Sequence, residues 1–135
     1  MDNGAQRLNE VFFYGLYMDP QVLRERGVTP RNARAGRVEG YRLRIGRMAT
    51  LLRDPHGVAH GMLYALTQDE LHALYVGAGL TAYVTEALAV QTAEGSVAAL
   101  CCNLRQPPGD DEDNPEYRAR LRDCMARLGL PAASD

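Results

Sequence analysis

The first element that the pattern predicts is an unbroken apolar run, and a turn and a short helix are predicted directly after it. Val11-Phe12-Phe13-Tyr14 is apolar and aromatic and stops at Gly15, which predicts a strand that is buried on both faces. Asp19 and Pro20 have the residue types of a helix N-cap and a first helical position, and Gly27 is a typical stop. The pattern therefore predicts a strand, a tight turn and a helix in this order.

Mixed apolar and polar positions follow, and they are typical of strands. Residues 38–43 and 45–52, which include Gly40 and Gly46, predict two strands. Asp54-Pro55-His56-Gly57 has the composition of a type I turn, with Pro second and Gly fourth. We expect this turn to join the second strand to a third, over residues 58–66, as a hairpin.

A second helix and a second hairpin come next. Thr67 and Glu70 form a capping box, so the apolar positions after them predict a helix that ends near Gly77. Two further strands, over residues 83–92 and 96–103, are separated by Ala-Glu-Gly, which is typical of a hairpin turn.

The C-terminal part contains an acidic loop and an amphipathic helix. Residues 106–113 are rich in Pro, Gly and acidic side chains, which indicates a solvated loop. Asn114-Pro115 begins a helix whose apolar residues share one face. These residues are Tyr117, Leu121, Cys124, Met125 and Leu128. The stripe is expected to pack against the body of the protein or against a partner.

Composition narrows the classes of function. With 135 residues, 46% of them hydrophobic and 24% charged, the chain fits one globular domain. All 15 basic residues are Arg, and the absence of Lys excludes Schiff-base chemistry and a lysine-type phosphate loop. A net charge of -2 lacks the basic excess of most nucleic-acid-binding proteins.

The termini and the cysteines indicate a compartment. The first ten residues lack a signal-peptide pattern, and no apolar run approaches the ~18 residues of a membrane helix. Three cysteines without a CxxC pair fit reduced thiols. We therefore expect a cytoplasmic protein that does not bind membranes.

The segment from Tyr14 to Met18 is the most informative for function. It lies between a buried strand and a helix start, where several backbone N–H groups can point in one direction. Such a turn can hold a carboxylate or another small anion. The arginines of segment 24–37 give a local positive excess, which could attract an anionic ligand or simply be solvated.

Four groups of residues follow one another in a recognisable order. They are Tyr14-Gly15-Leu16-Tyr17-Met18, Gly40-Tyr41-Arg42-Leu43, Gly61-Met62-Leu63-Tyr64, and Leu71 and Leu74 with Gly79 and Tyr83. In this order the chain resembles the gamma-glutamylcyclotransferase-like family over residues 11–104. That family includes avirulence-induced-gene-like proteins and acyl-ligand cyclotransferases.

The resemblance implies an α+β fold, namely a mixed β-barrel with flanking helices and a pocket at its mouth. Tyr14, Gly15, Leu16, Tyr17 and Met18 take the places of the family's loop, which holds the glutamyl carboxylate, and Tyr83 is expected to border the ligand. In active members a glutamate acts as general acid/base while the α-amine attacks the γ-carbonyl, and 5-oxoproline is released. The resemblance implies no cofactor.

The family's catalytic position falls on Ala78 in this chain. A methyl group cannot accept a proton, and general acid/base catalysis contributes about 10²–10⁴-fold to a rate. The nearest acids are Glu70, which the capping box explains, Glu94, which the hairpin turn explains, and Glu86 on the following strand. Glu86 is therefore the one candidate for a substitute catalytic residue.

Three hypotheses remain open. The chain binds a small γ-glutamyl or carboxylate ligand with doubtful cyclotransferase activity, or it is an active cyclotransferase or acyltransferase that uses Glu86. Alternatively, it is a non-catalytic interaction module whose last helix is the docking surface. No His or Cys spacing favours a metal site, and a homodimer is left open.

The expected organisation has four parts. They are an N-terminal tail over 1–10, a barrel domain over 11–104, an acidic loop over 105–113, and a C-terminal helix with a tail over 114–135.

Overall fold

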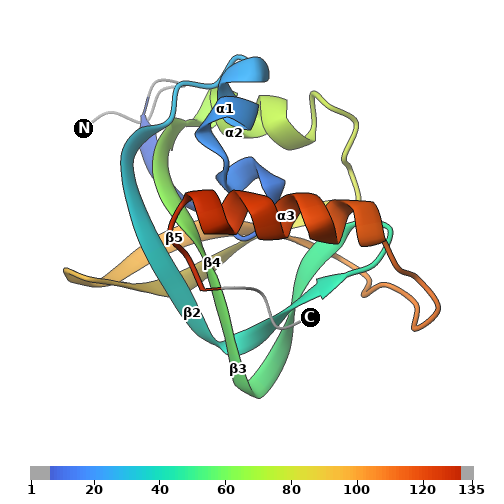
Figure 1. Ribbon diagram of the computed structural model, residues 1–135. Coiled ribbons are helices and arrows are strands. Elements are labelled where there is room, and N and C mark those ends of the chain that lie inside the picture. The colour runs from blue at the N-terminus through green and yellow to red at the C-terminus, as the bar shows by residue number, and fades with distance from the viewer. Residues whose placement is uncertain (1–6, 132–135) are drawn as a thin grey trace.

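Five strands close into a barrel in the computed structural model, which describes residues 7–131 (Figure 1). The strands are β1 (Leu8–Phe13), β2 (Arg31–Ile45), β3 (Ala49–Thr67), β4 (Tyr83–Thr92) and β5 (Gly95–Leu104). Their order around the barrel is β1-β3-β2-β4-β5. The barrel is mixed because β1 pairs in parallel with β5 and the other pairs are antiparallel. The expected α+β barrel is confirmed.

The strands enclose an apolar core. Phe12 and Leu63 face each other across the β1–β3 pair, and both are at most 1% exposed. Val90 of β4 and Cys101 of β5 are fully buried as well. The apolar run that predicted the first strand therefore forms one wall of the core, and it leads directly into the loop after Phe13.

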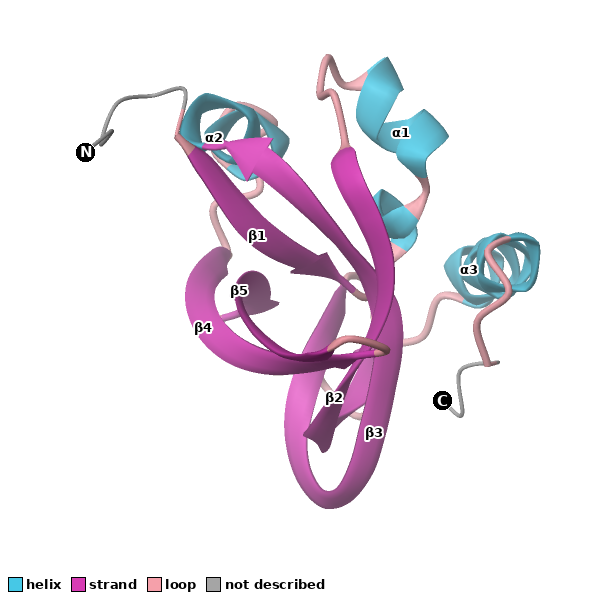
Figure 2. Ribbon diagram, turned by 90° about the vertical axis from the view of Figure 1, so that its left-hand side faces the viewer, coloured by secondary structure: helices cyan, strands magenta, loops and turns pink. Residues whose placement is uncertain are grey.

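The helices lie outside the barrel (Figure 2). A 3-10 turn, η1 (Leu16–Met18), precedes α1 (Pro20–Glu25), and α2 (Gln68–Tyr75) follows β3. Both α1 and α2 lie at one end of the barrel, while α3 (Pro115–Arg127) runs along its side. Within residues 7–131, no helix is both long enough and apolar enough to cross a membrane.

Helix starts follow the capping residues in the sequence. Asp19 and Asn114 accept backbone hydrogen bonds from Gln21 and Tyr117 at the starts of α1 and α3. At α2 both halves of the capping box between Thr67 and Glu70 are formed. The three predicted helix starts are confirmed.

The predicted hairpin at Asp54-Pro55-His56-Gly57 is wrong. The His56 N–H does donate to Asp54 Oδ1 at 3.0 Å, so the local turn chemistry is present. However, β3 pairs with β2 on both sides of this segment, because Tyr41 faces Arg53 and Glu39 faces Val58. The extra residues form an irregularity at which both strands bend, low in the view of Figure 1.

The chain reverses instead between β2 and β3, at residues 46–48. Only Gly46 signals a turn there, and the flanking Arg and Met are neutral in this respect. The strand expected over 38–43 is therefore part of β2, and residues 58–66 are part of β3. The single strand expected over 45–52 is wrong, because the turn at residues 46–48 lies within it.

The last helix packs on the body of the protein. Its residues Leu121, Cys124 and Met125 are at most 2% exposed. The apolar stripe is thus covered by the same chain. The tails expected at either end lie partly outside the described residues, and β1 begins at Leu8, inside the segment expected to be a tail.

Glu70 connects three segments, and we expect its loss to weaken the fold in a pH-dependent way. Its carboxylate accepts hydrogen bonds from the backbone N–H groups of Thr67 and Thr29 and from Arg31, the last at 2.9 Å. Burial opposes ionisation, but these hydrogen bonds outweigh it and hold the pKa of Glu70 below its ordinary value of 4.5. This lowered pKa stabilises the fold above pH 4.5, and the contribution is lost as the pH falls through the folded-state pKa.

Glu70→Gln should therefore reduce the free energy of unfolding by about 1–2 kcal/mol at neutral pH. Urea unfolding from pH 7 to pH 3 should show the two proteins converging at the acidic end. Glu94→Gln, at an exposed turn, is the matched control and should follow the wild type. A constant difference at every pH would contradict this role for the Glu70 charge.

Candidate functional site

A cavity of about 340 Å³ lies where the loop after β1 meets the helices. It is within the range of small-molecule pockets, about 300–1,000 Å³. Its walls come from several elements. They are Phe13, Tyr14, Gly15, Leu16, Tyr17, Val22, Arg26, Arg47, Met48, Ala49, Tyr75, Leu80, Tyr83, Tyr117 and Arg120. The predicted binding loop is thus part of a real hollow in the molecule.

Two buried tyrosines attach the loop to the barrel through hydrogen bonds. Tyr14 is 6% exposed, and its hydroxyl donates to the Cys102 carbonyl at 2.6 Å. The Tyr64 hydroxyl donates to the Met18 carbonyl, also at 2.6 Å. Burial, together with the nearby Cys124 and Asp19, raises the pKa of Tyr64 to about 12. Both phenols are therefore neutral donors. Tyr14 attaches the loop to β5, and Tyr64 attaches it to β3.

The backbone N–H of Leu16 marks the polar point of the loop. It donates to the hydroxyl oxygen of Tyr117, on α3, at 3.0 Å. Gly15 makes this approach possible, because a Cβ atom there would overlap the Tyr117 hydroxyl. An oxygen atom is therefore already accommodated at the place where a ligand carboxylate would accept the same hydrogen bond.

Three tyrosine rings form one aromatic wall. Tyr17 and Tyr75 meet edge to face with centroids 5.6 Å apart, and Tyr75 and Tyr83 follow at 5.3 Å. The hydroxyls of Tyr17 and Tyr83 donate to the carbonyls of Leu74 and Ala49. Burial raises the pKa of all three phenols, so they stay neutral.

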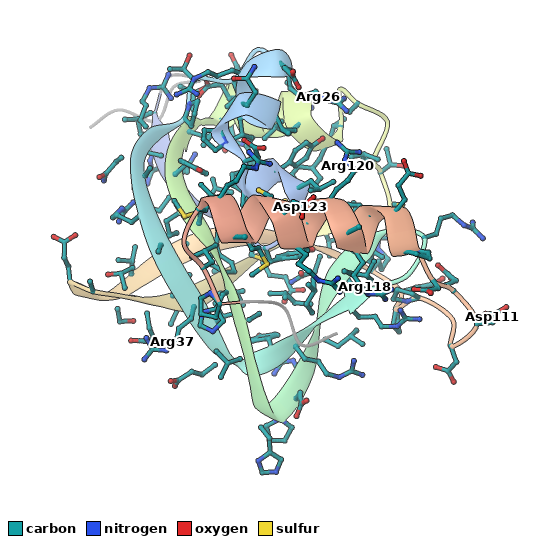
Figure 3. All side chains as sticks on the ribbon, in the orientation of Figure 1. Arg26, Arg37, Asp111, Arg118, Arg120 and Asp123 are labelled. Atoms are coloured by element: carbon teal, nitrogen blue, oxygen red, sulfur yellow. The ribbon has the colours of Figure 1, made fainter. Side chains whose placement is uncertain are left out.

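The cavity carries positive charge at its rim. Arg26, Arg47 and Arg120 line it, and no Asp or Glu of the described chain does. All three arginines are exposed. Figure 3 labels Arg26 and Arg120, which lie on the same side of the molecule, above α3 in the view. The rim therefore favours an anion, and the cavity offers no carboxylate that could accept a proton.

The structure brings together most of the predicted site residues. Tyr14, Gly15, Leu16, Tyr17 and Tyr83 all line the cavity. Met18 lies in the same loop but is fully buried and does not line the cavity.

Neither candidate for the catalytic position lines the cavity. Ala78 is exposed in the loop after α2, and its neighbour Leu80 reaches the lining instead. Glu86 is half-buried on β4, where its Oε1 accepts a hydrogen bond from Asn103 Nδ2 at 3.4 Å.

Sequence reasoning missed Tyr117, Arg47 and Arg120 as cavity residues. Tyr117 was assigned to a helix face by its periodicity, and nothing local distinguishes a helix face that covers a pocket from one that covers a core. Arg120 is one of several arginines on its helix. Its exposed position at the edge of the cavity results from how α3 packs.

No family model and no curated protein matches the sequence. Solved structures do match. One described as a gamma-glutamyl cyclotransferase is 18% identical, with a TM-score of 0.74 over 93% of this chain and 82% of its own. A yeast gamma-glutamyl cyclotransferase described as specific to glutathione is 14% identical, with a TM-score of 0.64 over 92% and 89%. An AIG2-like protein from Mus musculus is 19% identical, with a TM-score of 0.63 over 96% and 88%.

The chain has the gamma-glutamyl cyclotransferase fold. Nearly its whole length takes part in the match, so the barrel and the helices around it belong to one shared architecture. Within this fold, the Tyr14–Tyr17 loop and Tyr83 lie together at the cavity, as the motif order predicts. A likeness at this level of identity concerns the fold, and the activity has to be argued from the cavity itself.

Proposed function

We propose that the chain is a gamma-glutamylcyclotransferase-like protein that binds a small, amino-acid-derived carboxylate ligand in this cavity. The observation that carries the proposal is the Leu16 N–H in the loop that lines the hollow. Its acceptor is the Tyr117 hydroxyl at 3.0 Å, and a ligand carboxylate would displace this hydroxyl to accept the same hydrogen bond. The arginine rim supports the same ligand charge. The named enzymes among the matching structures support the choice of a γ-glutamyl or related carboxylate.

The same proposal includes weak cyclotransferase activity or none. Cyclisation needs a base beside the attacking amine, and no carboxylate of the described chain lines the cavity. Glu86 is engaged with Asn103 outside the lining, which disfavours the alternative of an active enzyme that uses it. The burial of Leu121, Cys124 and Met125 disfavours α3 as a docking surface.

Two measurements test this function. Carboxylates at millimolar concentration should raise the thermal midpoint, because a ligand that binds only the folded state stabilises it. Incubation with γ-glutamyl dipeptides should release 5-oxoproline at least about 10²-fold more slowly than an enzyme with a catalytic carboxylate. If no tested carboxylate raises the thermal midpoint, the binding role is refuted. Rapid release of 5-oxoproline would refute the loss of catalysis.

A further inference from the structure

The charges around the cavity are unbalanced, and they come from three separate parts of the chain. Arg26 follows α1, Arg47 lies in the β2–β3 turn, and Arg120 is on α3. No acidic side chain of residues 7–131 lines the cavity beside them. Clefts lined by one sign of charge concentrate ligands of the opposite sign.

These guanidinium groups are not used to hold the fold together. The ion pairs described in residues 7–131 involve other arginines, such as Arg31 with Glu70 and Arg127 with Asp19. Arg26 and Arg120 form no ion pair with a described residue.

The third rim arginine has an acidic neighbour that is held by the backbone. Glu112 Oε1 accepts a hydrogen bond from the Arg47 backbone N–H at 2.9 Å, and Glu112 Oε2 accepts one from the Gly109 N–H. The carboxylate of Glu112 is thus committed to the main chain, although its charge partly offsets that of Arg47. The net charge at the rim stays positive.

The aromatic wall adds no charge and few free hydroxyls. The hydroxyls of Tyr14, Tyr17 and Tyr83 donate to main-chain carbonyls, so the rings are what remains for a ligand to contact. A ligand would therefore meet the Leu16 N–H together with the Tyr117 hydroxyl that it would displace, an apolar wall of rings, and positive charge at the rim.

We propose that the cavity takes a small organic dianion, with two carboxylates joined by a short apolar chain and no ammonium group. This inference rests on the carboxylate-binding part of the proposed function, and it narrows the ligand to carboxylates that lack the α-ammonium of a γ-glutamyl group. One carboxylate binds at the Leu16 N–H, and the second faces Arg26 and Arg120. An ammonium group is disfavoured, because no carboxylate of residues 7–131 lines the cavity to pair with it and the rim repels it.

Three probes of similar size test the inference. Glutarate and glutamate share a five-carbon skeleton and differ in the ammonium group, while butyrate keeps one carboxylate. Isothermal titration calorimetry at fixed ionic strength should give an affinity for glutarate at least about tenfold above that for glutamate and for butyrate. Added salt should reduce the advantage over butyrate, because the rim is exposed.

The outcomes separate this inference from the proposed function. If glutamate binds as tightly as glutarate or more tightly, the dianion is wrong and the carboxylate-binding function stands. If butyrate matches glutarate, the second carboxylate has no partner and the inference fails in the same way. If none of the three binds, the proposed function itself fails.

A pair of variants on α3 tests the place of the second carboxylate. Arg120→Gln should weaken glutarate binding about five- to tenfold and change butyrate binding less than about twofold. Arg122→Gln is the matched control, since Arg122 is exposed on the same helix and does not line the cavity. It should change neither affinity. Equal weakening by both variants would show an effect of net charge alone and would overturn the assignment to Arg120.

Discussion

Replacing Gly61 by Ala should destabilise the protein by about 3 kcal/mol, the upper end for an added methyl group in a packed core. Gly61 lies in β3, where a Cβ atom would overlap the Phe13 carbonyl oxygen and lie 2.9 Å from Phe12 Cζ. The oxygen belongs to the backbone of β1 and cannot rotate away. β1 would have to move, and β1 leads directly into Tyr14 and the binding loop. Urea unfolding of the two proteins measures the loss.

Gly109→Ala is the matched control for this change. Its added Cβ would lie 2.9 Å from Asp111 Oδ1, the end of a side chain in an exposed loop that can turn aside. We expect its stability to stay within about 0.5 kcal/mol of the wild type. If Gly61→Ala were equally mild, β1 and β3 could not approach each other as closely as the structure has them.

Features that depend on neighbouring residues could be predicted from the sequence. The N-caps Asp19 and Asn114 and the Thr67–Glu70 capping box need only residues two or three positions away. The β4–β5 hairpin was equally accessible, because Gly95 adopts the φ of +118° that few other residues tolerate. Each of these predictions concerned hydrogen bonds that close within a short segment.

The Asp54–Gly57 segment shows why the same approach fails elsewhere. Its local chemistry is that of a turn, yet the strands on both sides pair with β2 and the chain does not reverse. Which partner a strand takes is decided by the closure of the barrel. A four-residue motif carries no information about that closure, and residues 46–48, where the chain does reverse, contain only one glycine as a signal.

The candidate site likewise contains some residues that the sequence indicated and others that it did not. The loop and Tyr83 were found because their motifs occur in a familiar order along the chain. The rim was not found, because Arg26, Arg47 and Arg120 are far apart in sequence and meet only through the packing of α1, the β2–β3 turn and α3. The arginine-rich segment 24–37 also proved heterogeneous. Arg31 and Arg34 pair with Glu70 and Glu10, while Arg26 reaches the cavity.

Replacing Gly15 by Val should weaken carboxylate binding about 10- to 100-fold, the value of one or two lost hydrogen bonds to a charged group. The new side chain would stand where the Tyr117 hydroxyl now meets the loop, so it would cover the Leu16 N–H that the ligand needs. Calorimetric titration with glutarate measures the loss. The same titration with Gly109→Val, outside this cavity, should match the wild type.

The fold should tolerate Gly15→Val better than it tolerates Gly61→Ala. Gly15 has φ -112° and ψ -157°, an extended conformation that any residue adopts. Among the described residues, the atoms near its Cβ position are the hydroxyl and Cζ of Tyr117, the outer end of a half-buried side chain. We expect this end to give way more easily than backbone does. Binding should thus be lost in a protein that still unfolds cooperatively near the wild-type midpoint. Undiminished glutarate affinity in such a folded variant would move the ligand away from the Tyr14–Tyr17 loop, since a carboxylate at Leu16 and a valine at Gly15 compete for the same space.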